Sequence, residues 1–469
     1  MNHETRPLPR WDFGAATRQS LRNESLAKAL FRATAKFDDG RRALMAALPE
    51  SDLLREKARQ IKDDVLQHLD RYLAEFADSV EKAGGVVHWA RTAGDANALV
   101  ASIARERNVK RIVKAKTMVS EETHLNEALE REGFCVMETD LGEYILQVAG
   151  DRPSHIVVPA VHRTKEEIAD LFNSSFGVSL PPEPAEITKF ARARLREEFA
   201  NADMGITGAN FAAADTGTVI QVTNEGNGRL CATWPPVQVV FMGIEKIIPR
   251  LEDLPVFLKL LARSATGQPM TVYTNLITGP RREGEGDGPR ELHVILIDNG
   301  RTAVLGSGYR QTLRCIRCGA CLNTCPVYRN VGGHTYGSVY PGPIGSVLSP
   351  LYEGRSRFNS LPHASSLCGA CYQACPMKIN IPHMLTAMRA EQAEHGENHV
   401  LERLGMRLWA LAMRSPLLYR FGGKALRWGM LPLSSEGWVS SLPYPFSGWT
   451  KRRDFPLPAK KSFRGSFKK

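Results

Sequence analysis

Seven of the nine cysteines lie in two short runs whose spacing suits iron–sulfur chemistry. The first run has the pattern C-x2-C-x2-C-x3-C-P, with cysteines at Cys315, Cys318, Cys321 and Cys325. The second run starts after 42 intervening residues and has the pattern C-x2-C-x3-C-P, with cysteines at Cys368, Cys371 and Cys375. Three thiolates two residues apart wrap one cluster, and the longer step before the proline turns the fourth thiolate away. The spacing therefore predicts two iron–sulfur clusters.

The pairing of the two runs follows from the same pattern, in which the fourth cysteine ligates the cluster of the other run. Cluster 1 is expected to take Cys315, Cys318, Cys321 and Cys375, and cluster 2 to take Cys325, Cys368 and Cys371. Cluster 2 is one thiolate short, because the residue in register with Cys315 is Ser365. It is then either a three-iron centre or a four-iron centre with another ligand. Ser365, His363, water and a partner protein are the alternatives for that ligand.

Other uses of these cysteines fit the sequence less well. Zinc sites also use C-x2-C pairs, but they need four ligands per ion and have no use for a four-cysteine run that ends in Cys-Pro. Disulfides suit neither an odd number of clustered cysteines nor a reducing compartment. Cys135 and Cys231 lie in apolar surroundings, so we expect both to be buried structural thiols.

The composition is that of an ordinary globular protein. The chain has 469 residues, of which 43% are apolar and 24% charged, so we expect two or three domains. The first 30 residues contain no apolar run of the signal-peptide type, and no stretch of about 18 apolar residues occurs anywhere. These features predict a cytoplasmic protein that spans no membrane.

The net charge of +11 is concentrated at the C-terminal end. Residues 401–469 contain 14 Lys and Arg against three acids, together with four of the seven tryptophans. The stretch around Trp409 predicts short basic amphipathic helices, which suit either docking on a partner subunit or an anionic membrane surface. A solvated tail is the third alternative. No nucleic-acid motif accompanies the charge, so we expect no nucleic-acid partner.

The chain before the cysteines alternates helical and strand patterns. Residues 1–82 read as helix, with apolar positions at helical spacing over 52–82 and a stop at Gly84-Gly85. Alternation of this kind predicts an α/β layer with a largely parallel sheet. Strands are expected at 86–89, 111–115, 134–139, 154–160, 218–222, 237–242, 272–273 and 292–297, and helices at 96–107, 124–132 and 165–172. The glycine-rich loop 281–289 reads as an exposed hairpin, because it lacks the Gly-Lys-Ser/Thr of a phosphate loop.

The cysteine region reads differently from the α/β region. Its long spacer predicts loops with a short helix at 344–352, followed by a helix at 384–395. We therefore expect a mostly helical two-cluster domain. The predicted domains are a helical region at 1–82, an α/β domain at 83–305, the cluster domain at 306–395 and a basic, tryptophan-rich region at 396–469.

A polar run in the α/β region is a second candidate site. Thr207-Gly-Ala-Asn210 and Asp215-Thr-Gly-Thr precede a strand, and Thr223-Asn-Glu225-Gly-Asn227 follows it. Glycines among Asn, Thr and Asp build anion-binding nests, and Asp215 or Glu225 suits acid–base work. The same residues are also ordinary turn chemistry. Lys114 and Lys116 either reach a carboxylate or phosphate or are solvated.

These motifs together resemble the lactate-utilization protein B family, the iron–sulfur proteins of bacterial three-protein L-lactate oxidation systems. The resemblance rests on Lys114-Ala-Lys-Thr-Met-Val-Ser-Glu-Glu122, on the polar run and on both cysteine runs, and it covers nearly the whole chain. It implies an α/β LUD domain related to sugar-phosphate isomerases and CoA-transferases, then a helical ferredoxin-like domain and a family-specific tail. The seven cluster cysteines carry over, and Ser365 stands where the family also lacks a cysteine.

The resemblance implies an electron-transfer subunit of an L-lactate dehydrogenase complex. Electrons from lactate would pass through the two clusters to a cysteine-rich partner, with lactate-utilization proteins A and C as partners and a carrier such as quinone at the end. The chain alone is not expected to oxidise lactate, because one-electron centres do not readily accept a hydride. The alternatives are a LUD domain that binds or acts on a small carboxylate or CoA-like anion through Lys116 and Asn210, and a scaffold with structural clusters.

Overall fold

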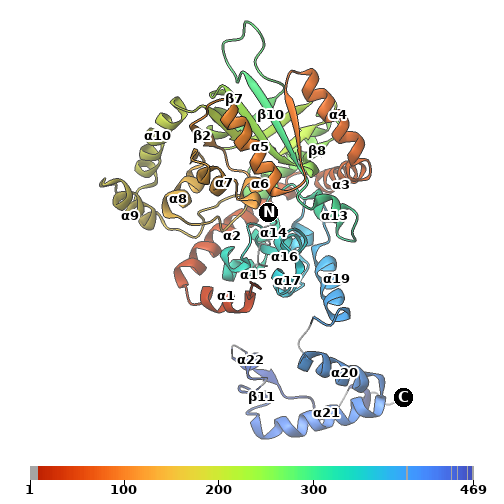
Figure 1. The fold of residues 1–469 in the computed structure, drawn as a ribbon. Coiled ribbons are helices and arrows are strands. Elements are labelled where there is room, and N and C mark those ends of the chain that lie inside the picture. The colour runs from red at the N-terminus through yellow and green to blue at the C-terminus, as the bar shows by residue number, and fades with distance from the viewer. Residues whose placement is uncertain (1–8, 398–399, 445, 452, 462, 467–469) are drawn as a thin grey trace, which may run out of the picture. The chain divides into compact units, whose positions relative to one another are not determined.

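The computed structural model describes residues 9–397, 400–444, 446–451, 453–461 and 463–466. The chain divides into two compact units, Met1–Arg389 and Ala390–Lys469 (Figure 1). All nine cysteines belong to the first unit. The first eight residues of the helical region predicted at 1–82, and the last three of the basic region, lie outside the described residues.

A six-stranded sheet forms the centre of the first unit. Its strand order is β1-β10-β7-β4-β2-β3, and every neighbouring pair is parallel. Its strands are β1 (Val86–Ala90), β2 (Arg111–Lys114), β3 (Cys135–Glu138), β4 (Met204–Thr207), β7 (Val237–Gly243) and β10 (Glu291–Ile297). Strands β4 and β7 are buried along their whole length, as expected where helices cover both faces of a parallel sheet. The predicted α/β fold class is confirmed.

Alternate residues of the central strands pack against helices on opposite faces. Val240 and Met242 of β7 pack with α3 (Ser51–Gln67) and α4 (Leu69–Lys82). Val239 and Phe241 pack with α5 (Ala93–Glu106) and α7 (Leu125–Arg131) on the other face. The helix α6 (Met118–Thr123) follows β2. The single helix predicted over 52–82 is two helices, because the backbone of His68 leaves the helical region at φ −126°.

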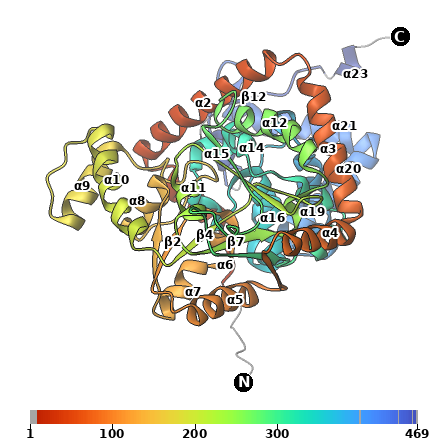
Figure 2. The ribbon, with the colours of Figure 1, turned by 90° about the horizontal axis from the view of Figure 1, so that it is seen from above.

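Three helices pack beside the sheet on the side of β2 and β3. Figure 2 shows two of them, α9 and α10, at the side of the molecule. They are α8 (Leu141–Ala149), α9 (Lys165–Phe176) and α10 (Pro184–Ala200). Thr164 and Glu167 form a capping box at the start of α9, and Gly177 ends it in the left-handed conformation. Together with Val113 and Ala115 their apolar faces make a separate core cluster.

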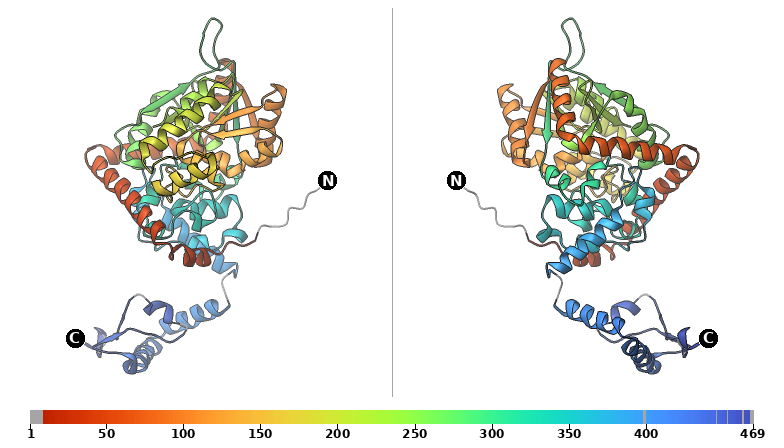
Figure 3. Two further views of the ribbon diagram at one scale, coloured as in Figure 1. Left: turned by 90° about the vertical axis from the view of Figure 1, so that its left-hand side faces the viewer. Right: turned by 90° about the vertical axis from the view of Figure 1, so that its right-hand side faces the viewer.

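Two of the predicted strands belong to a second sheet. Strands β8 (Ile247–Ile248), β5 (Phe211–Ala213), β6 (Thr218–Thr223) and β9 (Tyr273–Ile277) lie in that order, with both pairings of β6 antiparallel. Helices α11 (Asn227–Thr233) and α12 (Leu254–Thr266) flank it in the chain. The 281–289 loop is exposed but is not a hairpin, because β9 and β10 on its two sides belong to different sheets (Figure 3).

The strand predicted at 154–160 is wrong, since this segment consists of bends and turns. Its polar groups serve the cysteine region instead of a sheet. Tyr328 donates its hydroxyl to the Ser154 carbonyl at 2.6 Å, and His155 Nε2 lies 3.0 Å from Asn323 Oδ1. The apolar residues of the segment therefore mark a packing surface.

The cysteine region is helical, as predicted, and contains no strand between residues 306 and 395. Its helices gather below the sheet in the view of Figure 1. They follow α13 (Arg301–Leu305) in the chain and are α14 (Ala320–Asn323), α15 (Pro326–Val331), α16 (Gly342–Tyr352), α17 (Arg355–Phe358), α18 (Ala370–Ala374) and α19 (Ile381–Glu394). Helices α1 (Phe13–Ser20) and α2 (Glu24–Ala46) pack against this region, where Gly332 of the α15 end contacts Leu30.

The second unit contains the predicted amphipathic helices. They are α20 (Val400–Arg414) and α21 (Pro416–Met430), and the unit also has β11 (Trp438–Val439), α22 (Ser447–Thr450), β12 (Phe455–Pro456) and α23 (Phe463–Ser466). No residue of α20 is buried. Among the described residues, no helix combines the length and the apolar character that crossing a membrane requires.

Candidate iron–sulfur site and adjoining cavity

The two cysteine loops share one backbone conformation. Arg317 and Gly319 flank Cys318 with φ of 59° and 76°, and Leu367 and Gly369 flank Cys368 with φ of 55° and 83°. Each loop then enters a short helix, α14 or α18. Positive φ is uncommon outside glycine, so finding it twice at matching positions marks a true structural repeat. The register that pairs Cys318 with Cys368 therefore holds in three dimensions.

Ser365 occupies the place of Cys315 in the second loop. In the first loop the Arg317 amide donates to Cys315 Sγ at 3.4 Å. In the second loop the Leu367 amide donates to Ser365 Oγ at 3.1 Å. The two side chains thus accept the same hydrogen bond three positions before the equivalent cysteines, Cys318 and Cys368.

Four cysteines make up the first thiol group. Burial raises the pKa of Cys321 well above its usual range, and the neighbouring Cys315, Cys318 and Cys375 add to the shift. Burial and the neighbours Cys375 and Cys315 raise the pKa of Cys318 in the same way. Cys315 is partly exposed and the other three are buried.

Three cysteines make up the second thiol group. Burial raises the pKa of Cys371 to about 12, with Cys325 and Cys368 as the neighbouring thiols that add to it. Cys368 is the exposed member, and hydrogen bonds from the Ala370 amide and from Ser366 lower its pKa. Cys371 also raises the pKa of Cys321 in the first group, so the two groups adjoin.

The two groups fit the donor set of iron–sulfur clusters. Thiolates that are crowded together in a buried space repel one another, and only a strongly positive core holds all of them deprotonated. Sulfur ligands in sets of four and three, with no histidine or carboxylate among them, suit iron–sulfur chemistry. The structure brings together the cysteines that the spacing assigns to each cluster.

The two remaining cysteines divide. Cys231 is fully buried, as predicted, and burial raises its pKa to about 12. The prediction of a buried Cys135 is wrong, since this residue is exposed. It begins β3, which is the edge strand of the sheet, so the apolar residues beside it in the sequence do not cover it.

A buried charge network joins the sheet to the first cysteine loop, and sequence reasoning gave it no role. The Arg301 side chain is fully buried, with Nε 2.5 Å from Glu245 Oε2 and Nη1 2.9 Å from Glu122 Oε1. Tyr340 of the cysteine region donates its hydroxyl to Glu122 at 2.6 Å. Arg317 stacks 4.4 Å from the centre of the Tyr340 ring. The cysteine loop is therefore anchored to residues that follow β2 and β7.

A cavity of about 420 Å³ lies where β2, β4 and β6 end. Its walls include Lys116, Asn210 and Glu225 from the polar segments singled out in the sequence, and Cys318 from the first cysteine loop. Asp215 is not in the lining, and its carboxylate accepts the Leu251 amide at 3.0 Å.

Lys114 is neither solvated nor part of the cavity. Its side chain is fully buried, with Nζ 2.7 Å from Glu138. The cavity itself was not predictable as such, because its walls come from eight separate segments of the chain.

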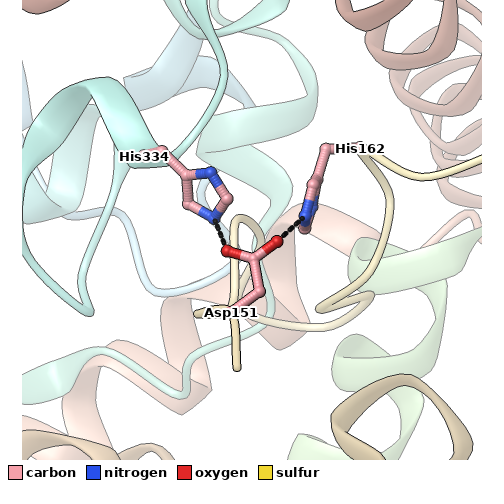
Figure 4. Close-up of side chains that lie close together, drawn as sticks. All are labelled: Asp151, His162 and His334. Carbon is pink, nitrogen blue, oxygen red and sulfur yellow. Dashed lines mark hydrogen bonds and ion pairs between the residues drawn. The ribbon is translucent and has the colours of Figure 1, made fainter. Parts of the chain in front are cut away.

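Asp151, His162 and His334 form a second polar cluster, which Figure 4 shows with both imidazoles directed at the carboxylate. Asp151 Oδ2 lies 3.1 Å from His162 Nε2, and Oδ1 lies 3.9 Å from His334 Nε2. The three ligand atoms lie close enough together to hold a metal ion. However, the Arg163 guanidinium lies 2.7 Å from the same Asp151 oxygen and already neutralises it. We therefore assign this trio a structural role in holding the 151–163 loop against His334.

Three protein-family models match the chain. They are the LUD domain over residues 73–297, the 4Fe-4S dicluster domain over 311–379 and the C-terminal region of lactate utilisation protein B over 384–469. The cluster-domain match supports iron–sulfur clusters in the cysteine region.

Curated relatives cover almost the whole chain. Lactate utilization protein B of Bacillus subtilis is 46% identical over 96% of this chain and 94% of its own length. The protein of the same name from Bacillus licheniformis is 46% identical over 95% of this chain and 94% of its own length. A solved structure of a DUF162 family protein from Deinococcus radiodurans aligns with 49% of this chain and 98% of its own at 15% identity, with a TM-score of only 0.28.

Proposed function

The chain belongs to the lactate utilization protein B family, and from this membership we propose that it is the iron–sulfur electron-transfer subunit of a complex that oxidises L-lactate to pyruvate. The name of the relatives and the dicluster domain support a role in lactate utilization. Electron transfer through the clusters is what we propose beyond that role.

The observation that carries the proposal is that the two thiol groups lie near enough for Cys371 to raise the pKa of Cys321. Cys315, Cys318, Cys321 and Cys375 would hold cluster 1, and Cys325, Cys368 and Cys371 would hold cluster 2. Clusters of this type, when bound, exchange single electrons at potentials set by their surroundings. The electrostatic coupling of Cys321 to Cys371 supports two clusters that adjoin, as a relay requires.

The second thiol group offers the side from which a partner would approach. Cys368 is exposed, and the side chains beside it, Leu367 and Tyr372, are 37% and 42% exposed. The first group is mostly buried and borders the cavity. We propose that a cysteine-rich subunit of the complex docks over the Cys368 side, with a second LUD-domain subunit in the same assembly and a carrier such as quinone as final acceptor. The assembly would work in the cytoplasm or at the inner face of the membrane.

Counting irons on anaerobically purified chain tests the clusters directly. We expect about seven or eight irons per chain with matching sulfide, and two paramagnetic signals in low-temperature EPR spectra after reduction with dithionite. Partner proteins with L-lactate should reduce the clusters and give the same signals. Zinc in place of iron and sulfide would contradict the proposal.

The variant Ser365→Cys identifies the cluster at the second loop in the same experiment. Because Ser365 matches Cys315 in its hydrogen bond, a cysteine there would complete the four-cysteine pattern. If the natural centre has three irons, the three-iron signal should disappear in the variant and the iron count should rise by about one. An unchanged spectrum would show that a four-iron centre is already complete.

We propose that the second unit, which carries most of the net positive charge, docks on a partner subunit through the apolar face of α20. Leu404, Leu408 and Leu411 share one helix face and are 53%, 59% and 59% exposed. Replacing both Leu408 and Leu411 by Gln should weaken co-purification with the partner subunits by at least about tenfold, because burying each leucine contributes about 2 kcal/mol. Glu402→Gln on the opposite face is the matched control. Unchanged co-purification, with loss of binding to anionic vesicles instead, would favour a membrane surface.

A further inference from the structure

The cavity beside the first cysteine loop contains a lysine that has no hydrogen-bond or ion-pair partner in the described part of the chain. Lys246 follows β7, lines the cavity and is only 8% exposed. Among the described residues, no hydrogen bond or ion pair reaches its ammonium group. The adjacent Glu245 does not neutralise it, because that carboxylate is bound by Arg301 and lies 3.6 Å from Arg317. An ammonium group on a nearly buried side chain is costly without a partner, so its position points to an anion as that partner.

Other donors in the same walls are also left over. The Asn210 side chain accepts the Val222 amide through Oδ1, and within the described residues its NH2 group has no partner. Gln221 likewise accepts from Asn275 through Oε1, and its NH2 group donates to nothing described. Arg317, which lines the cavity too, keeps a buried Nη1 without a hydrogen bond. These unused donors call for acceptor oxygens, which an anion supplies.

Lys116 adds a second ammonium group that is only partly neutralised. Its Nζ lies 3.4 Å from Glu143 but makes no hydrogen bond in the described part of the chain. Burial raises the pKa of Glu143 to about 8, so this carboxyl is largely uncharged near neutral pH.

Two acids, Asp140 and Glu225, line the cavity, and both have tasks of their own at the start of α8. Asp140 accepts the amides of Gly142 and Glu143, and Glu225 accepts the amide of Leu141. Burial also raises the pKa of Glu225 to about 7, which reduces its charge. The charges around the cavity that are not already neutralised by a neighbour are therefore mainly positive.

The position in the fold agrees with a ligand site. The cavity lies beyond the carboxyl ends of β2 and β4, where open parallel sheets bind their ligands. Apolar side chains of the 156–159 segment and of α12 form another part of its wall. Ile316, Arg317 and Cys318 close one side, so a ligand there would lie against the loop that holds three cysteines of the first thiol group.

We propose that this cavity binds a small 2-hydroxy carboxylate, with Lys246, Lys116 and Arg317 facing its carboxylate and the Asn210 amide facing its hydroxyl group. The inference rests on the proposed function, from which L-lactate is the member of this class to be expected. The apolar wall would receive the carbon side chain. Because about 420 Å³ is more than a three-carbon acid fills, the site should not reject longer 2-hydroxy acids by size.

Calorimetric titration of the anaerobically purified full chain, with its clusters, tests the proposal. L-lactate, 2-hydroxybutyrate, propionate and inorganic phosphate are the probes. We expect L-lactate and 2-hydroxybutyrate to bind within about tenfold of each other. Propionate should bind more weakly, since it leaves the hydroxyl partner unsatisfied.

Two variants remove the anion site in different ways. Lys246→Met keeps the length of the side chain and should weaken L-lactate binding by about 10-fold to 100-fold, as loss of a charged hydrogen bond does. Asn210→Asp keeps the acceptor for the Val222 amide but places a negative charge in the cavity, so it should weaken binding at least as much. Lys189→Met, at a lysine that is 76% exposed on α10, is the matched control and should bind like the natural chain.

The outcomes separate this inference from the proposed function. No heat with any probe, equal affinity in all four proteins, or binding of phosphate alone would overturn the carboxylate site. Iron content and EPR signals measured on the same samples report the clusters independently. Intact, reducible clusters without lactate binding would leave the relay standing and refute only the site.

Discussion

Replacing Cys318 by alanine should abolish growth on L-lactate and leave growth on glucose intact. Cys318 is 7% exposed and belongs to the first thiol group, where alanine would remove one of the four ligands that we propose for cluster 1. A cluster that loses a thiolate at a buried position has no water or side chain of equal softness to replace it. The growth rate on lactate as sole carbon source, and the iron content of the purified variant, measure the effect. We expect about half of the iron to be lost with the first cluster.

Two further cysteine variants make this result specific. Cys231→Ala removes a fully buried thiol that belongs to neither group, so lactate growth should persist. Cys371→Ala removes a ligand of the second group that does not line the cavity, and growth on lactate should fail as with Cys318. Normal lactate growth of both Cys318→Ala and Cys371→Ala would refute the electron relay.

Local spacing explains why the thiol groups could be predicted. Ligands two residues apart wrap one centre whatever the rest of the chain does, and the same pattern gives the cysteine before each proline to the other centre, so the two runs predict both groups before any fold is known. The central sheet was predictable for a similar reason, since buried strands such as β4 and β7 read as short apolar runs between helices.

The errors arose where tertiary contacts override local pattern. The 154–160 segment has strand-like residues but gives its Ser154 carbonyl to Tyr328, 174 positions away. Cys135 has apolar neighbours yet lies on an edge strand with no cover. Neither the hydrogen bond to Tyr328 nor the edge position of Cys135 leaves a signal in the nearby sequence.

The cavity shows the same limit from the functional side. Lys116 and Asn210 were candidates from local chemistry, but their convergence with Lys246 and Cys318 depends on the order of the strands. Lys246 stands in an apolar stretch that reads as the end of a strand, so sequence reasoning passed over it. Only the fold brings this positively charged cavity next to the first thiol group.

Replacing Arg301 by methionine should cause a large loss of stability of the first unit. The guanidinium is fully buried and holds Glu122 and Glu245, which are 3% and 1% exposed. Removing it leaves two buried carboxylates without their main partner, and breaking a buried ion pair in this way costs about 3–5 kcal/mol. Urea unfolding of the purified chain, followed by circular dichroism, measures the change in the free energy of unfolding.

The same variant should also disturb the cysteine region, because Glu122 holds Tyr340 and Glu245 faces Arg317. We therefore expect loss of iron at urea concentrations at which the natural chain retains it. Adding Glu122→Gln to Arg301→Met should recover part of the lost stability, since it removes one of the two uncompensated charges. Arg250→Met, at an arginine that is 62% exposed, is the control and should change stability by no more than about 0.5 kcal/mol. Equal stability of the Arg301 and Arg250 variants would show that the network does not join sheet and cysteine loop energetically.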